Sequence, residues 1–115
     1  MLPAVAQGAI GIACRENDPR FEGYLAKLNH METHIAVNCE RAFLTQLDGS
    51  CRTPIAALAV RTADGGLDFK GLLAKPDGSL LLRTARTGKW DNKEGIAIGK
   101  DAGAEVAKKA GPGFF

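Results

Sequence analysis

Two short runs of turn-forming residues divide the middle of the chain into three strand-like stretches. Residues 63–66 (Ala-Asp-Gly-Gly) and residues 76–78 (Pro-Asp-Gly) are typical of tight turns. The stretches before, between and after them, 55–61, 67–74 and 79–87, carry strand-like runs of apolar side chains. In 79–87, alternate residues fall on the two faces of the predicted strand. Turns this short can join only antiparallel strands, so the sequence predicts a three-stranded meander. One face of such a sheet needs a cover.

The cover is predicted on both sides of the meander. An apolar residue recurs every four positions from Met31 to Leu47, which indicates a helix that begins with a capping pair, Asn29 and Glu32, and ends at Gly49. Residues 93–110 return to a helical pattern, with Ile98, Ala102 and Val106 on one stripe. The expected fold class is therefore α+β, a three-stranded antiparallel sheet with helices on one face in the order α-β-β-β-α.

The first 28 residues fit this unit less well. Small and apolar residues alternate over 9–14, which favours a strand that would be buried on both faces, and no nearby segment supplies its sheet. Asp18 and Pro19 then open a helix with an apolar face formed by Phe21, Tyr24, Leu25 and Leu28. We therefore expect the partner of residues 1–28 to lie upstream.

Composition excludes several classes of function. The 115 residues are 45% apolar and 24% charged, with a net charge of +2, as in an ordinary globular domain without an electrostatic preference for nucleic acid or a membrane surface. No apolar run reaches the roughly 18 residues that a bilayer span needs. The N-terminus resembles neither a secretory signal nor a transit peptide.

The three cysteines, Cys14, Cys39 and Cys51, match no zinc-binding spacing, so free thiols are expected. Cys39 falls on the apolar helical stripe, and Cys14 ends the first predicted strand, so both are predicted to be buried. Cys51 follows the predicted helix end, between Ser50 and Arg52. A loop thiol beside a positive charge can be a nucleophile, but the residues alone favour an ordinary loop cysteine.

Other polar groups have simpler interpretations. His30 and His34 are four residues apart on a helix, but they lack the zincin spacing and a third ligand, so no metal site is predicted. The carboxylate pairs Asp101/Glu105 and Glu32/Glu40 are interpreted as surface charge. The cations on or near the hairpins are interpreted as solvated strand positions, because exposed aromatic residues are too few for nucleic-acid binding. They are Lys70, Lys75, Arg83, Arg86 and Lys89.

Several ordered blocks of the sequence resemble one enzyme family. They are residues 2–12 (LPAVAQGAIGI), 28–30 (LNH), 40–44 (ERAFL) and, above all, 47–55 (LDGSCRTPI). Together they are similar to the C-terminal part of the porphobilinogen deaminase (hydroxymethylbilane synthase) family. Ser50 and the ending 110–115 (AGPGFF) resemble its plastid-type members, which implies a plastid stroma in a plant or alga and the cytoplasm otherwise.

The resemblance implies a transferase of tetrapyrrole biosynthesis, which supplies heme and chlorophyll. The family enzyme joins four porphobilinogen molecules into hydroxymethylbilane with release of ammonia, and a monomer is expected. A cysteine at the position of Cys51 carries a dipyrromethane cofactor, the primer, through a thioether. A covalent anchor keeps the growing end in place through every cycle. The expected cofactor-binding residues are Cys51, Ser50, Gln7 and Gly8. The alternative for Gln7 and Gly8 is that they make only a tight backbone contact.

The resemblance also divides the chain. Residues 1–28 correspond to the closing segment of the upstream catalytic domains, and residues 29–115 correspond to the C-terminal cofactor-carrying domain. The family's catalytic aspartate and its anion-binding arginines have no counterpart here, so no catalytic residue is assigned in this chain. We therefore expect the chain alone to be inactive, and its partners to be the missing upstream domains. In a second interpretation, the chain is a non-catalytic fragment or interaction domain that needs the upstream half.

Overall fold

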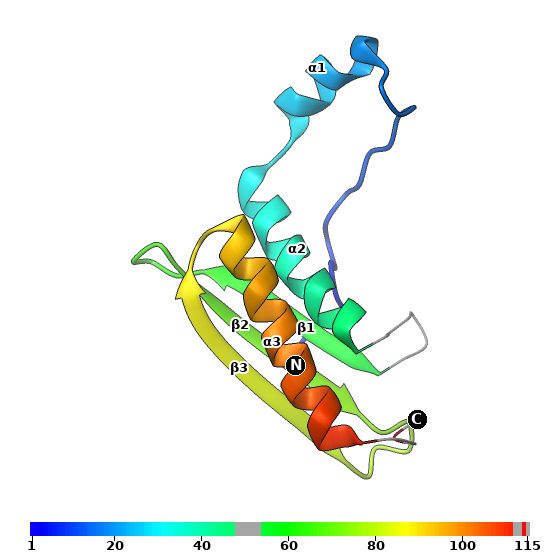
Figure 1. Cartoon of the computed structure of the whole chain (residues 1–115), viewed down its shortest axis with the longest axis vertical. Helices are drawn as coiled ribbons and strands as arrows, with labels where there is room; N and C mark the ends of the chain where they lie inside the picture. The colour runs from blue at the N-terminus through cyan, green and yellow to red at the C-terminus, as the bar shows by residue number, and fades with distance from the viewer. Residues whose placement is uncertain (48–53, 112–113, 115) are drawn as a thin grey trace.

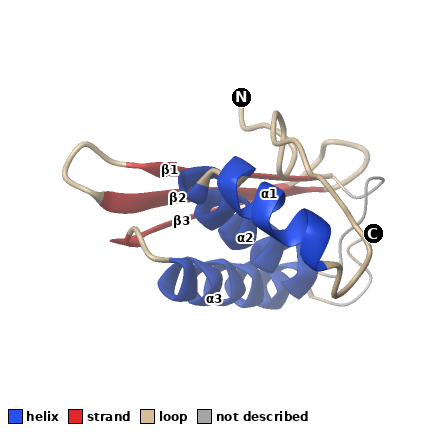
Figure 2. Cartoon of the chain, turned by 90° about the horizontal axis from the view of Figure 1, so that it is seen from above, coloured by secondary structure: helices blue, strands red, loops and turns tan. Residues whose placement is uncertain are grey.

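The computed structural model describes residues 1–47, 54–111 and 114, and its elements follow the predicted order. The helices are α1 (Pro19–Leu28), α2 (Met31–Gln46) and α3 (Asn92–Ala110), and the strands are β1 (Ile55–Arg61), β2 (Gly66–Ala74) and β3 (Leu81–Lys89). The strands form one antiparallel sheet in the order β1-β2-β3. Figure 1 shows α2 and α3 side by side across this sheet, and Figure 2 shows both on the same face of it. The α+β prediction is confirmed.

The core lies between the sheet and the two covering helices. Alternate residues of β2 point toward the helices, and Leu67, Phe69 and Leu73 are at most 1% exposed. The ring of Phe43 from α2 meets Phe69 edge to face, with 5.2 Å between ring centroids. A Cβ added at Gly71 would lie 2.7 Å from Phe43 Cζ, so the glycine makes room for the ring. Burial of these aromatic and aliphatic side chains holds the helices to the sheet.

Helix α3 packs on α2 through a seam of glycines. Gly95, Gly99 and Gly103 recur every four residues and are buried with Ala102 and Val106. A Cβ at Gly103 would lie 2.6 Å from Cβ of Gln46 on α2, so the helix axes approach more closely than larger residues would allow. The predicted stripe of Ala102 and Val106 is confirmed, but Ile98 is only half-buried. The sequence interpretation missed the glycines.

Some element boundaries differ from the prediction, and one cannot be compared with it. The N-cap of α2 is His30, not Asn29, because the His30 ring accepts a hydrogen bond from the Thr33 N–H. Strand β3 begins at Leu81 and ends at Lys89, two residues later than predicted, because its register places Leu81 opposite Ala74 and Lys89 opposite Gly66. Helix α2 ends at Gln46, and Gly49, the predicted stop, lies outside the described residues.

The predicted strand over 9–14 is not formed in this chain. These residues carry no helix or strand and are exposed, and the exposed fraction of Ile10 is 90%. A strand exists only by hydrogen bonding to a neighbour, and no described strand lies against this segment. The prediction that Cys14 is buried is wrong for the same reason: its thiol is exposed.

Helix α1 begins as predicted, with Asp18 as N-cap and Pro19 in its first turn, but it packs against little. None of its residues is buried, and Figure 1 shows it at the far end of the molecule from the sheet. No helix among the described residues is long and apolar enough to cross a bilayer.

Candidate functional site

The segment predicted to carry the cofactor is held at both ends by the core. On the α2 side, the Leu47 N–H donates to the Phe43 carbonyl at 3.3 Å, and on the β1 side the Pro54 carbonyl accepts from the Ala74 N–H at 2.9 Å. Cys51 and Ser50 themselves lie outside the described residues. The described residues on either side of Cys51 in the sequence are thus hydrogen-bonded to α2 and β2.

Gln7 and Gly8 lie in an exposed turn near the N-terminus. The turn is closed by the Ala9 N–H, which donates to the Ala6 carbonyl at 3.2 Å. Gly8 has φ +83° and Ala6 has φ +62°, a left-handed conformation that is unfavourable for alanine. Both Gln7 and Gly8 are open to solvent in this chain.

Glu40 anchors this turn to the folded unit. Its carboxylate accepts from the Ala6 N–H at 2.8 Å and from the Ala59 N–H of β1 at 3.1 Å. Glu40 is 6% exposed, so its interpretation as surface charge is wrong. A signal was available in the sequence, because Glu40 lies four residues after Ala36 and four before Leu44, both of which pack on the core.

The two cysteines within the described residues are in opposite environments. Cys39 is fully buried, as predicted, and desolvation, with a smaller effect of the nearby Glu40 carboxylate, raises its pKa to about 12. Such a thiol is inert at neutral pH. Cys14 is exposed, and its thiol donates to the Arg15 carbonyl at 3.3 Å.

The two histidines make local hydrogen bonds rather than a metal site. The His30 ring is 2.7 Å from the Thr33 hydroxyl, and the His34 ring is 3.1 Å from the Asn38 amide. Among the described residues, no three His, Cys, Asp or Glu side chains gather as metal ligands. Both histidines line a hollow of about 660 Å³ between residues 8–12 and the helices α1 and α2.

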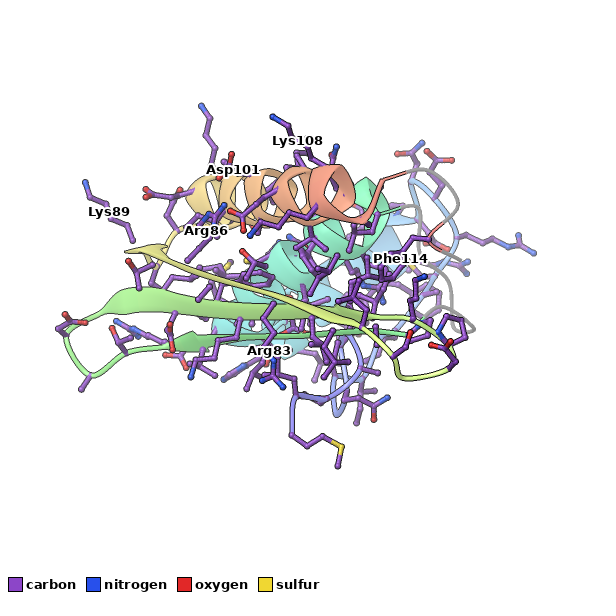
Figure 3. All side chains as sticks on the ribbon, turned by 90° about the horizontal axis from the view of Figure 1, so that it is seen from below. Arg83, Arg86, Lys89, Asp101, Lys108 and Phe114 are labelled. Atoms are coloured by element: carbon purple, nitrogen blue, oxygen red, sulfur yellow. The ribbon has the colours of Figure 1, made fainter. Side chains whose placement is uncertain are left out.

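The other carboxylates of the two pairs considered in the sequence, Glu32, Asp101 and Glu105, pair with arginines. Glu32 binds Arg61 at 2.8 Å, and Arg86 lies between Asp101, at 3.2 Å, and Glu105. The Arg86 guanidinium, with a smaller contribution from Lys109, lowers the pKa of Glu105. In Figure 3, Arg86 lies on the helix side of the sheet and Arg83 on the opposite side. These groups link elements to each other, and none of them forms a carboxylate pair suited to acid–base catalysis.

Comparison with known proteins supplies the family. The family model described as "Porphobilinogen deaminase, C-terminal domain" matches residues 34–108. The chloroplastic porphobilinogen deaminase of Pisum sativum is 62% identical over all 115 residues, which cover 31% of that protein. The corresponding protein of Oryza sativa subsp. japonica is 61% identical over the same 115 residues, 32% of its length. The chain thus spans about a third of the curated relatives that it matches. Since the family model covers most of the chain, this protein belongs to the porphobilinogen deaminase family, as its C-terminal domain.

Proposed function

We propose that this chain is the primer-carrying part of a complete porphobilinogen deaminase, in which Cys51 holds dipyrromethane through a thioether. The observation that carries the proposal is the family match over residues 34–108, which spans Cys51. When bound, the dipyrromethane supplies the start of the chain to which porphobilinogen units are added. The complete enzyme would join four porphobilinogen molecules into hydroxymethylbilane and release ammonia.

The fixed ends of the Cys51 segment support this role. Leu47 donates its N–H to Phe43, and the Pro54 carbonyl accepts from Ala74, so the described residues on both sides of Cys51 in the sequence belong to the packed unit. A covalent anchor between two such elements would remove much of the entropy cost of presenting a substrate end to catalytic groups. We propose Ser50, Gln7 and Gly8 as further primer-binding residues. Gln7 and Gly8 suit this because their turn is exposed while its backbone is held by Glu40.

The catalytic groups are proposed to lie upstream, in the part of the enzyme that the relatives have and this chain does not span. Glu32 and Glu105 are paired with arginines, and Glu40 accepts from backbone N–H groups, so these three carboxylates serve structural contacts. We therefore expect no hydroxymethylbilane synthesis from the 115 residues alone. Since both relatives are named chloroplastic, we propose that the complete enzyme works in the plastid.

Intact-mass spectrometry of the complete enzyme tests the anchor. The wild type is expected to carry the added mass of one dipyrromethane, and the Cys51→Ser variant is expected to lack it together with activity. Cys14→Ser is the matched control, because Cys14 is an exposed cysteine outside the segment. An unmodified wild type, or an adduct that persists in Cys51→Ser, would show that the assignment is wrong.

A second candidate function is an interaction domain that docks on its upstream half. It is favoured by the exposed apolar side chains of the first 31 residues, which include Ile10, Ile12, Tyr24, Leu28 and Met31. Mixing the 115-residue chain with a separately produced upstream half is expected to form a complex. Ile10→Asp with Ile12→Asp is expected to weaken that complex, and equal binding by this variant would contradict docking through residues 9–14.

A further inference from the structure

Glu40 is a buried carboxylate whose two oxygens each accept a backbone hydrogen bond. Oε1 accepts from Ala6, 34 residues earlier, and Oε2 accepts from Ala59, 19 residues later. Among the described residues Glu40 has no cationic partner. Burying a charged group costs free energy unless hydrogen bonds replace its hydration. The two backbone N–H groups offset this cost for the Glu40 carboxylate.

The Ala59 contact lies on the free edge of the sheet. Among the described strands β1 pairs only with β2, which leaves alternate N–H groups of β1 pointing outward. The Ala57 N–H donates to the Pro3 carbonyl at 3.0 Å, and the Ala59 N–H donates to Glu40. The N-terminal segment is thus fastened along this edge by one direct hydrogen bond and by one that runs through the Glu40 carboxylate.

The Ala6 contact holds a strained turn. An alanine at φ +62° persists only where the surroundings fix it, and the hydrogen bond to Oε1 does so. The next two residues of the same turn are Gln7 and Gly8. Their position relative to the sheet therefore depends on Glu40.

We infer that Glu40 is a positioning residue that sets the place of Gln7 and Gly8 relative to α2 and β1, the elements that precede and follow Cys51 in the sequence. Glu40 belongs to α2, which precedes Cys51 in the sequence, and its carboxylate binds β1, which follows Cys51. One side chain thus joins both flanking elements to the Ala6 turn. This inference rests on the proposed function, in which Gln7 and Gly8 bind the primer that Cys51 carries.

The carboxylate is required because it offers an acceptor to each of two donors. Glutamine has one acceptor oxygen, and its amide N–H₂ would face one of the two backbone donors. Glu40→Gln should therefore lose one contact and Glu40→Ala both. Glu32→Gln is the matched control, since Glu32 lies on the same helix but is exposed and binds only Arg61.

Hydrogen–deuterium exchange and kinetics of the complete enzyme test the inference. In Glu40→Ala, exchange of the peptides that contain Ala6 and Ala59 is expected to speed up by about tenfold, because each loses a charge-assisted hydrogen bond. The kcat is expected to fall by about tenfold while KM for porphobilinogen stays within about twofold, because substrate-binding groups are left in place. Glu40→Gln should show the exchange effect at one of the two peptides, and Glu32→Gln should behave as the wild type.

Two results would overturn the positioning role. One is unchanged exchange of the Ala6 peptide in both Glu40 variants. The other is faster exchange with an unchanged kcat, which would make Glu40 a structural residue only. If Glu40→Ala does not fold, the nearly isosteric Glu40→Gln still decides between these outcomes. Intact mass is recorded on the same samples: a wild type without primer refutes the proposed function, whereas the exchange results test Glu40 separately.

Discussion

The buried thiol of Cys39 should make the stability of the protein depend on pH in the alkaline range. Its pKa is raised to about 12, first by desolvation and then by the Glu40 carboxylate. In the unfolded chain the thiol loses its proton near its ordinary value of 9.0, so above that pH the unfolded state binds fewer protons than the folded one. The free energy of unfolding should therefore decline as pH rises from about 9 toward 12.

The Cys39→Ala variant isolates this effect. It loses packing contacts at every pH, but its alkaline decline should be shallower than that of the wild type, because no thiol titrates at that position. Urea unfolding at pH values from 7 to about 10.5 measures both slopes. Cys14→Ala serves as the control because Cys14 is exposed. If the free energy of unfolding declined equally with pH in Cys39→Ala and the wild type, the Cys39 thiol would not be the titrating group.

At the scale of elements, the glycine seam fixes how α3 lies on α2. A Cβ at Gly99 would collide with the Cys39 carbonyl and the Ala42 side chain, whereas a Cβ at Gly95 would meet its nearest atom, Leu67 Cδ1, at 3.4 Å, an ordinary contact. Gly99→Ala should therefore destabilise the protein by about 2 kcal/mol or more, because overpacking outweighs the gain in helix propensity. Gly95→Ala should be neutral or stabilise by up to about 1 kcal/mol. Urea midpoints compare the stability of the two variants. An equal loss of stability in both would show that overpacking at Gly99 is not the cause.

The elements also show why some features could be predicted and others could not. The meander was predictable because its turns are local and each strand pairs with its neighbour in sequence. The ends of β3 were not, because the ladder with β2 sets them rather than the turn residues. A strand over 9–14 needs a neighbouring strand, and none of the described strands lies against this segment. The partners of Glu40 lie 34 and 19 residues away, so its apolar neighbours on α2 were the only local sign of its burial.

At the scale of the whole molecule, most of the first 28 residues are less closely packed than the sheet and its two covering helices. The molecule extends 50 × 34 × 22 Å, and Figure 1 shows α1 and the segment before it looping away from the packed layers. Pro3 is hydrogen-bonded to β1, Ala6 is hydrogen-bonded to Glu40, and Val5 packs against the core. Residues 7–28 include no buried residue. That division agrees with the boundary predicted near residue 29, which stays a prediction.

Limited trypsin digestion tests the boundary. Arg15, Arg20 and Lys27 are exposed and lie in or beside α1, which has no buried residue, so cleavage there requires only local opening. These sites should be cut before the described lysines and arginines of α2, α3 and the strands, whose cleavage requires opening of the packed unit. In the complete enzyme the same three sites should be protected, because residues 1–28 would then pack on the upstream domains. Early cleavage inside α2 or α3, or equal cleavage of the three sites with and without the upstream domains, would place the boundary elsewhere.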